Sequence, residues 1–303
     1  MKIAMIGAGA MGSLFGALLT EAGESVTLLD IRQDHVDAVN ADGLSIEHDG
    51  RQRTVRVPAT SDPDRIGPVD LAFFFVKSVH TAAAARTAAR LVADASLVLT
   101  LQNGMGNAEA LTTSISPTRI VAGTTAHGAT FLRPGAIRHA GVGETVIGAW
   151  QPPAADGIEA VADTFNRAGI VTRVVEDVQS VLWSKLFVNI GINAITALTG
   201  ITNGQLLDRP ETRQLARAAV AEAVAVARAR NIAVDGDPVE KVFAIATATG
   251  PNRSSMGQDV DNRRLTEISA INGFIARMAD TVGVLAPVNR TLTALVETLQ
   301  HHY

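Results

Sequence analysis

One lysine lies in a strongly apolar stretch with helical periodicity, where its type and spacing indicate acid–base chemistry. The chain has only four lysines among its 26 lysines and arginines, and Lys185 is one of them. Lys185, Asn189 and Asn193 recur at every fourth position, so they share one face of the expected helix. A desolvated lysine can release its proton near neutral pH, whereas an arginine cannot. We therefore favour a proton donor over an ordinary solvated face, which is usually built from Glu, Lys and Arg.

A glycine-rich turn near the N terminus has the spacing of a dinucleotide-binding fingerprint. The run Gly7-Ala8-Gly9-Ala10-Met11-Gly12 follows an expected strand and precedes an expected helix. Glycines let the backbone approach a pyrophosphate, which the positive end of the helix then stabilises. This context favours a cofactor site over a glycine-rich turn without a ligand.

Two charged residues after the second expected strand bear on the choice of cofactor. Asp30 closes that strand, where a carboxylate can accept hydrogen bonds from the adenosine ribose and would repel the 2′-phosphate of NADP. Arg32 follows two positions later and could bind that phosphate, or it could be a solvated loop charge. Asp30 thus predicts NAD, and Arg32 keeps NADP open.

Polar side chains follow two further expected strands. Lys77 comes directly after one apolar run, and Asn103 follows the next, within Gln102-Asn103-Gly104-Met105-Gly106. Ligands of open α/β sheets lie outside the carboxyl ends of the strands, so we expect Gly7, Lys77 and Asn103 to face one crevice. Taken singly, each polar residue has an ordinary alternative. Asn103 could belong to a turn-forming Asn-Gly pair, and Lys77 could be a solvated charge at the end of a strand.

A second polar cluster lies near residue 255. Ser254 and Ser255 could cap a helix that begins near Asp259. Glu267 could form an ion pair with Arg263 or Arg264 at helical spacing. On residue type alone we favour these structural roles.

Length and composition exclude several classes of function. The 303 residues predict about two domains, and the absence of cysteine excludes disulfides, thiol catalysis and thiolate metal sites, and fits a cytoplasmic protein. A net charge of −4 argues against a nucleic-acid or anionic-membrane partner, which leaves a small molecule. Four glycines break the apolar run at residues 3–20, so we do not expect it to span a membrane. The seven histidines show no metal-ligand spacing and are interpreted as structural, with His127 the one exception because it follows a strand end.

The order of elements predicts an α/β protein with two domains. Residues 1–176 alternate strands and helices, which is typical of a Rossmann-type doubly wound sheet, and residues 177–303 predict a second, all-helical domain. The expected strands are 2–6, 25–29, 70–76, 96–101, 119–125 and 170–175, with helices at 11–22, 81–93 and 158–168 and hairpins at 44–57 and 136–150. The expected helices of the second domain are 178–198, 211–230, 238–248, 259–282 and 288–299.

Taken together and in this order, the motifs resemble the ketopantoate reductase (2-dehydropantoate 2-reductase) family over essentially the whole chain. The segments that carry the resemblance are Gly7–Gly12, Leu101–Gly106, Gly123–His127, Trp183–Asn193, Ser254–Met256 with Gln258 and Asp259, Thr266–Ile268, and Ile271–Gly273.

The resemblance implies NAD(P)H-dependent reduction of 2-dehydropantoate, or of a closely similar branched 2-keto acid, in pantothenate biosynthesis. It implies Lys185 as the general acid, with Asn103 and Lys77 beside the nicotinamide and the substrate. The implied substrate ligands are Glu267, Ser255, Asn189 and Asn193, with Glu267 also helping to keep Lys185 charged and oriented. These roles replace the structural ones favoured above for Ser255 and Glu267.

Two departures from the family pattern bear on cofactor and substrate. Many members have a basic residue at the end of the second strand, which matches NADPH use, so the family favours NADP, whereas this chain has Asp30 and then Ile31. Gly257 replaces a larger apolar residue, which we interpret as widening the pocket. The alternatives are an NADH-dependent D-2-hydroxyacid dehydrogenase of the same fold, a 3-hydroxyacid or opine-type dehydrogenase, and a non-catalytic dinucleotide-sensing protein. A homodimer remains open.

Overall fold

The chain forms two compact units in a computed structural model that describes residues 1–151 and 156–303. Unit 1 comprises Met1–Gln102 and Asn107–Val178, and unit 2 comprises Asn103–Gly106 and Gln179–Tyr303. The loop Asn103–Gly106 thus belongs to the helical unit, although it follows a strand of the sheet. A single boundary after residue 176 does not describe this exchange, because composition does not show which unit a short loop contacts.

Unit 1 is built on a sheet that, within the described residues, has eight strands in the order β12-β11-β8-β7-β6-β1-β2-β5. The pairs are parallel except β8 with β11. Strand β2 pairs with one side of β1, and β6, which comes later in the chain, pairs with the other side. The strand order therefore reverses beside β1, which creates a topological switch point. This confirms the doubly wound sheet. The bounds are β1 Lys2–Ile6, β2 Ser25–Leu29, β5 Ala59–Thr60, β6 Val69–Phe74, β7 Val92–Thr100, β8 Ile120–Thr125, β11 Thr145–Ala149 and β12 Thr172–Val174.

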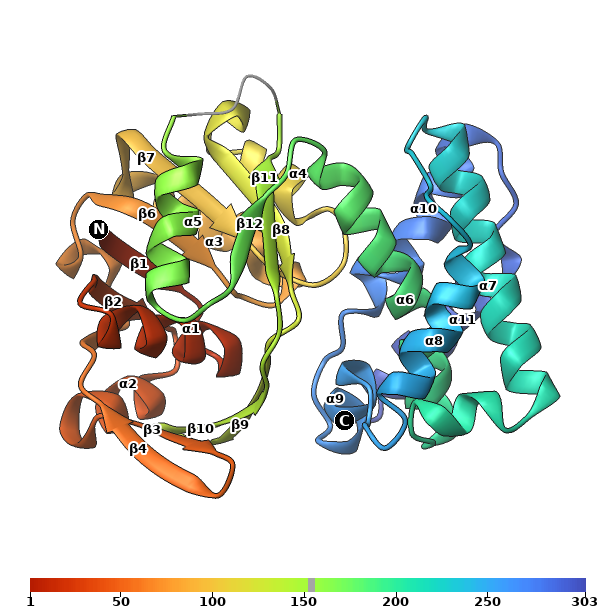
Figure 1. Cartoon of the computed structure of the whole chain (residues 1–303), viewed down its shortest axis with the longest axis horizontal. Helices are drawn as coiled ribbons and strands as arrows, with labels where there is room; N and C mark the ends of the chain where they lie inside the picture. The colour runs from red at the N-terminus through yellow and green to blue at the C-terminus, as the bar shows by residue number, and fades with distance from the viewer. Residues whose placement is uncertain (152–155) are drawn as a thin grey trace. The chain divides into compact units, whose positions relative to one another are not determined.

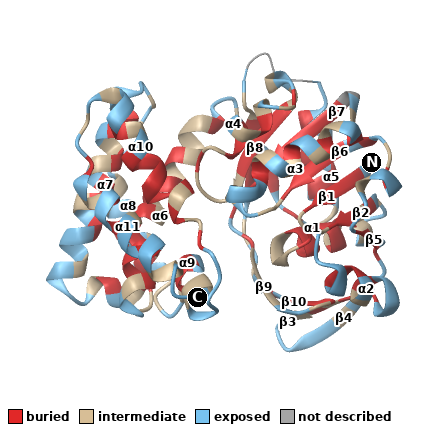
Figure 2. Ribbon diagram, turned by 180° about the vertical axis from the view of Figure 1, so that it is seen from behind, coloured by how far each residue is buried: buried red, intermediate tan, exposed pale blue. Residues whose placement is uncertain are grey.

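Helices cover both faces of this sheet (Figures 1 and 2). Phe15 of α1 and Phe165 of α5 both pack on Phe73 of β6, with ring centroids 5.5 Å away in each case, so α1 and α5 share one face. Helices α3 and α4 contact each other on the opposite face. The helices are α1 Ala10–Glu21, α2 Gln33–Asp42, α3 Thr81–Ala88, α4 Asn107–Thr112 and α5 Ile158–Arg167, with 3-10 turns η1 Pro63–Arg65, η2 Ser78–His80, η3 Ala89–Leu91 and η4 Pro117–Arg119.

A smaller sheet in the order β4-β3-β10-β9 extends the core of unit 1. Its strands are β3 Leu44–His48, β4 Arg51–Val55, β9 Gly128–Arg133 and β10 Ala136–Gly141. The hairpin expected at 44–57 is confirmed by the antiparallel pairing of β3 with β4. The hairpin expected at 136–150 is wrong, because β10 pairs with β9 and β3 whereas β11 belongs to the main sheet. The turn signal that was missed is Pro134-Gly135, where Gly135 has a φ of +73°.

Unit 2 is helical, as expected (Figure 1), and its buried apolar residues, including those of α6, form one cluster. Its helices are α6 Val178–Thr199, α7 Pro210–Ala229, α8 Pro238–Ala248, α9 Ser255–Asp261, α10 Asn272–Val282 and α11 Pro287–Gln300, with 3-10 turns η5 Gly204–Leu207 and η6 Ile268–Ala270. Helix α6 is long and apolar enough to cross a membrane by length and composition, but 61% of its most apolar window is buried inside the protein. Burial of this kind is typical of a core helix.

The single helix expected at 259–282 is wrong. Helix α9 begins four residues earlier, because Ser254 caps it by accepting a hydrogen bond from the Gly257 N–H at 3.0 Å. The helix ends at Asp261, and Arg263 has a left-handed φ of +49°. Apolar periodicity across this segment hid the break, which leaves Glu267 in a loop immediately before η6.

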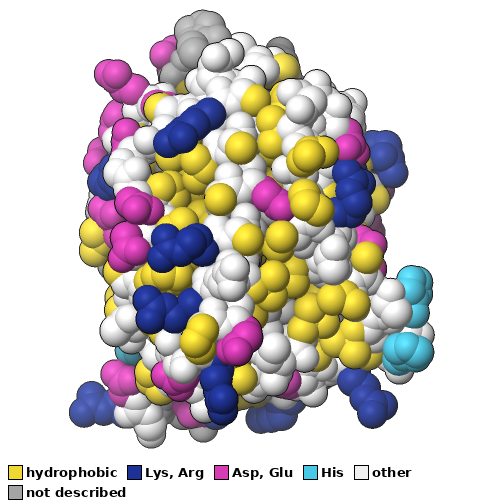
Figure 3. Space-filling view, turned by 90° about the vertical axis from the view of Figure 1, so that its right-hand side faces the viewer, with side chains coloured by type: hydrophobic (Ala, Val, Ile, Leu, Met, Phe, Trp, Pro, Cys, Tyr) yellow, Lys and Arg dark blue, Asp and Glu magenta, His cyan; other side chains and the backbone are white. Residues whose placement is uncertain are grey.

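One face of the helical unit carries mixed side chains (Figure 3). Lysines and arginines alternate there with acidic and hydrophobic groups, and this face has no continuous basic band among the described residues. Leu285 and Leu295 are exposed apolar residues of this unit.

Candidate active site

The turn between β1 and α1 has glycines where the backbone leaves no room for a side chain. Gly7 has a φ of +93°, and a Cβ on it would lie 2.6 Å from the Val76 nitrogen. A Cβ on Gly12 would lie 2.0 Å from the Gly7 carbonyl oxygen. These two glycines therefore make the tight turn and the close approach of α1 to the strand end possible.

Gly9 has a different environment from these two glycines. Apart from Gly9 and its two chain neighbours, no described residue has an atom within 4 Å of the point where a Gly9 Cβ would stand, and no described side chain caps the N terminus of α1. Backbone N–H groups of the first helical turn thus lie beside open space, at the positive end of a twelve-residue helix. The turn fits the pyrophosphate of a dinucleotide.

Asp30 and Arg32 are held by local contacts after β2. The Asp30 carboxylate accepts a hydrogen bond from the Arg32 backbone N–H at 2.9 Å. The Arg32 guanidinium lies 4.3 Å from the Phe131 ring centroid and 3.4 Å from an Asp34 carboxylate oxygen. Arg32 therefore already has an aromatic and an acidic partner, while Asp30 lies at the strand end where a ribose is expected.

The buried side chain of Gln102, for which the sequence predicted no role, holds the loop that carries Lys77. The Gln102 amide nitrogen donates to the Val76 carbonyl oxygen at 2.6 Å and to the Thr81 hydroxyl at 2.8 Å. Its amide oxygen accepts from the Thr100 hydroxyl at 2.8 Å. The network ties the carboxyl end of β6 to that of β7, and Lys77 lies exposed in the loop. A polar residue at the end of a buried strand was the signal available in the sequence.

In unit 2, α6 carries the expected polar face. Lys185 and Asn189 are half-buried, and Asn193 is 5% exposed. Burial of the Lys185 ammonium lowers its pKa from 10.5 to about 8, against the opposing influence of the Glu267 carboxylate, which raises it. At neutral pH this lysine is mostly protonated, yet it gives up its proton far more readily than an exposed lysine would.

Helix α9 brings Ser255 to the same face of α6. The Asn193 amide nitrogen lies 3.5 Å from the Ser255 hydroxyl oxygen, and the Thr196 hydroxyl donates to the Ser254 hydroxyl at 2.7 Å. Ser254 is thus used structurally, as the cap of α9 and a partner of α6. Ser255 is exposed, so its hydroxyl is available to a ligand.

The loop Asn103–Gly106 docks on the segment that follows Glu267. The Met105 N–H donates to the Ala270 carbonyl oxygen at 2.8 Å, and the Met105 side chain joins the helical core. Gly104 has a φ of +79°, and a Cβ on it would lie 2.6 Å from that same carbonyl oxygen. This close backbone contact places Asn103 and Glu267 on adjoining segments of unit 2.

His127 has a structural environment in unit 1. Its ring stacks on that of His139, with Nδ1 3.2 Å from His139 Nε2, and the His139 ring stacks in turn on His48. Burial lowers the pKa of His127 and of His139. Among the described residues, no group of histidine and acidic side chains could hold a metal ion.

The predicted site residues fall into two sets. Unit 1 holds Gly7–Gly12, Asp30, Arg32 and Lys77, and unit 2 holds Asn103, Lys185, Asn189, Asn193, Ser255 and Glu267. The first set fits a dinucleotide. The second combines an acid of lowered pKa with hydroxyl, amide and carboxylate groups, which is what protonating a carbonyl oxygen and holding a small polar acid require.

Two family profiles match the chain. The profile described as "Ketopantoate reductase PanE/ApbA" matches residues 3–152, and "Ketopantoate reductase PanE/ApbA C terminal" matches residues 177–300. The chain is 38% identical to the 2-dehydropantoate 2-reductase of Halobacterium salinarum, covering 99% of both chains. It is 37% identical to the enzyme of the same name from Pyrococcus horikoshii, covering 98% of this chain and 97% of that one.

Solved structures show the same fold. A PanE/ApbA family ketopantoate reductase from Ralstonia eutropha is 34% identical with a TM-score of 0.92, covering 100% of this chain and 99% of that one. A D-mandelate dehydrogenase in complex with NADH and anilino(oxo)acetate is 27% identical with a TM-score of 0.94, at the same coverage.

The lowered pKa of Lys185 predicts a specific dependence of stability on pH. Between about 8 and 10.5 the unfolded chain binds a proton that the folded chain has released, so the free energy of unfolding should rise with pH in this window. The change Lys185→Met should remove that part of the slope. Urea unfolding of both proteins across the window measures it, and equal slopes would contradict the lowered pKa.

Proposed function

The chain belongs to the ketopantoate reductase family, and we propose that it reduces 2-dehydropantoate, or a closely similar branched 2-keto acid, to the 2-hydroxy acid. It is an oxidoreductase that acts with a nicotinamide dinucleotide on a CH–OH group and its carbonyl counterpart. The observation that carries the substrate class is the polar face of α6, where burial lowers the pKa of Lys185 to about 8 and the Glu267 carboxylate opposes that shift.

In this proposal Lys185 donates the proton that the reduced carbonyl oxygen needs. A bound dinucleotide, for which the turn at Gly7–Gly12 and the N terminus of α1 leave room, would supply hydride to the keto carbon. Negative charge then grows on the keto oxygen, where the Lys185 ammonium stabilises it and transfers a proton. Glu267 keeps the lysine charged at neutral pH despite its burial.

The neighbouring polar groups suit the two ends of a hydroxylated keto acid. Ser255 would donate to the substrate carboxylate, since its hydroxyl is exposed beside Asn193. Asn189, Asn193 and Glu267 would bind the substrate hydroxyl, and Asn103 would contact the substrate from the loop that docks beside Glu267. Lys77 would contact the dinucleotide in unit 1.

We propose NADH as a donor at least as good as NADPH. Asp30 would place a like charge beside a 2′-phosphate, and Arg32 is engaged with Asp34 and Phe131. The D-mandelate dehydrogenase complex, with its NADH, is in keeping with this choice.

That same neighbour supports a second candidate, an NADH-dependent D-2-hydroxyacid dehydrogenase. The two chains share a backbone at a TM-score of 0.94, so fold alone does not separate the two functions. A panel of 2-keto acids with and without a hydroxyl group, assayed with both dinucleotides, separates them. Preference for 2-dehydropantoate would further assign the chain to pantothenate biosynthesis.

Removing the proton donor should reduce turnover and leave cofactor binding intact. We expect Lys185→Ala to lower kcat by about 10² to 10⁴, and Lys185→Arg not to restore it, because a guanidinium does not release a proton near neutral pH. Steady-state kinetics and dinucleotide titration measure the two effects. Lys2→Ala removes an exposed ammonium at the start of β1 and serves as the control. Near-normal turnover in Lys185→Arg would refute the general-acid role.

The pH dependence of reduction should follow the protonated fraction of Lys185. Because its pKa is about 8, kcat/KM for the keto acid should fall about tenfold per pH unit above that value. Glu267→Gln removes the charge that raises this pKa, so the inflection should move to lower pH. An inflection unmoved in Glu267→Gln would separate Glu267 from the titration of Lys185.

Cofactor preference should depend on the carboxylate of Asp30. Asp30→Asn removes the like charge and should shift the ratio of kcat/KM values toward NADPH. Arg32→Ala in the same background tests whether the guanidinium then contacts the 2′-phosphate. A wild-type preference for NADPH that is unchanged in Asp30→Asn would show that Asp30 does not face the ribose.

A further inference from the structure

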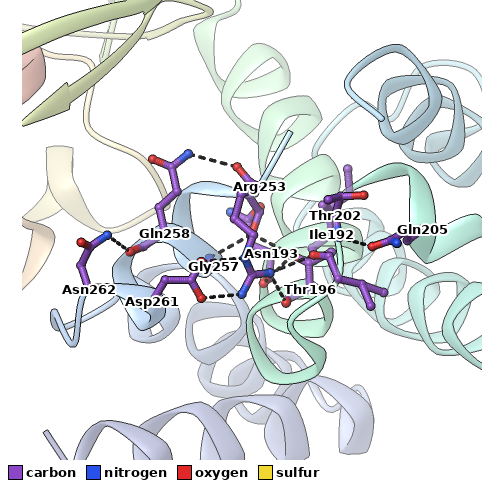
Figure 4. Close-up of polar contacts among 12 residues, drawn as sticks. Ile192, Asn193, Thr196, Thr202, Gln205, Arg253, Gly257, Gln258, Asp261 and Asn262 are labelled. Carbon is purple, nitrogen blue, oxygen red and sulfur yellow. Dashed lines mark hydrogen bonds and ion pairs between the residues drawn. The ribbon is translucent and has the colours of Figure 1, made fainter. Parts of the chain in front are cut away.

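The arginine that precedes the serine pair is bound at both ends of its guanidinium (Figure 4). Arg253 donates through Nη1 to the carbonyl oxygens of Thr196 at 2.5 Å and Ile201 at 2.8 Å. Through Nε and Nη2 it donates to the Asp261 carboxylate at 2.8 and 2.9 Å. A single side chain thus links the C-terminal end of α6 to the C-terminal end of α9.

Gly257 lies directly beneath this guanidinium. A Cβ on Gly257 would lie 2.7 Å from the Arg253 Cζ and Nη1 atoms and 3.0 Å from Nε. The arginine cannot easily move aside, because each of these nitrogens already donates in a planar arrangement and only 19% of the side chain is exposed. A side chain at position 257 and the observed position of Arg253 therefore exclude each other.

This contact corrects the interpretation of Gly257 as a widening of the pocket. The space left by the missing side chain is filled by the Arg253 guanidinium rather than left open to a ligand.

Several contacts hold α9, and with it Ser255, against α6. The Ser254 hydroxyl accepts from Thr196, Asn193 lies 3.5 Å from Ser255, and Met256 packs in the same apolar core as α6. Beyond the end of α6, the Asn203 N–H donates to the Asn252 carbonyl oxygen at 2.9 Å. Among the polar contacts of this segment, those of the guanidinium are charge-assisted and join α9 to the end of α6.

We infer that Arg253, whose guanidinium lies against Gly257, is a positioning residue for substrate binding. It holds α9 against α6 so that the Ser255 hydroxyl can donate a hydrogen bond to the carboxylate of the keto acid. This inference rests on the proposed function for its substrate. The arginine itself touches neither substrate nor dinucleotide, and it acts through the placement of Ser255.

A double-mutant cycle on positions 253 and 257 tests the inference. Arg253→Ala should raise KM for the keto acid about tenfold while the dinucleotide Kd changes less than about twofold, because the dinucleotide turn lies in unit 1. Gly257→Leu should raise KM by a similar factor, because the new side chain displaces the guanidinium. Gly257→Ala adds the Cβ alone and gives a milder version of the same displacement.

The variant with both changes distinguishes coupling from two independent defects. In Arg253→Ala with Gly257→Leu, the leucine occupies the space that the guanidinium leaves, so KM should be no higher than in either single variant. The inference would be overturned if KM in the double variant rises by the product of the two single-variant factors. It would also be overturned if KM is unchanged in Arg253→Ala. Arg228→Ala removes an exposed arginine of α7 in the same unit and should leave KM unchanged.

Amide hydrogen exchange separates this inference from the proposed function. The N–H of residue 257, which donates to the Ser254 hydroxyl in the wild type, should show a lower protection factor in both single variants and recover protection in the double variant. A wild-type protein that reduces no 2-keto acid with either dinucleotide would refute the proposed function. Unchanged exchange in Arg253→Ala would refute the positioning role, whatever substrate the protein takes.

Discussion

The candidate site depends on one electrostatic balance, the desolvation of the Lys185 ammonium against the charge of Glu267. Burial within a core helix lowers the pKa of this lysine to about 8, and the carboxylate limits the drop. An exposed lysine holds its proton too tightly for this role, and burial without a neighbouring carboxylate would disfavour the charged form further. The break between α9 and α10 matters for this reason, because it leaves Glu267 in a loop.

A second constraint comes from the path of the chain. The loop Asn103–Gly106 leaves unit 1 after Gln102 and packs on Ala270 through a backbone hydrogen bond and a glycine of positive φ. The side chain of Gln102 makes three hydrogen bonds within unit 1. The chain is therefore anchored in unit 1 at Gln102 and in unit 2 at Met105, three residues later, which keeps Asn103 with the helical unit by local geometry.

Local patterns predicted the features that depend on local sequence. The glycine turn, the alternation of strands and helices and the shared face of Lys185, Asn189 and Asn193 all follow from periodicity or from the space a side chain needs. The errors concern partners distant in the sequence. Alternation at 136–150 indicated strands but not that β10 and β11 pair in different sheets, and apolar periodicity at 259–282 did not show the break at Arg263. The roles proposed for Ser255 and Glu267 came from the family resemblance, since residue type alone favoured a cap and an ion pair.

The similarity to both ketopantoate reductases and a D-mandelate dehydrogenase indicates where substrate choice is determined. Backbones that agree at TM-scores of 0.92 and 0.94 hold a dinucleotide turn and a helical unit in common, so the backbone does not distinguish a branched keto acid from an aromatic one. The difference must come from side chains of the helical unit and from how they are held. Gly257 illustrates the point: read alone it predicts a larger pocket, but the structure shows an arginine in that space, bound to α6 and α9. A small residue therefore enlarges a site only when no neighbouring side chain can occupy the volume it leaves.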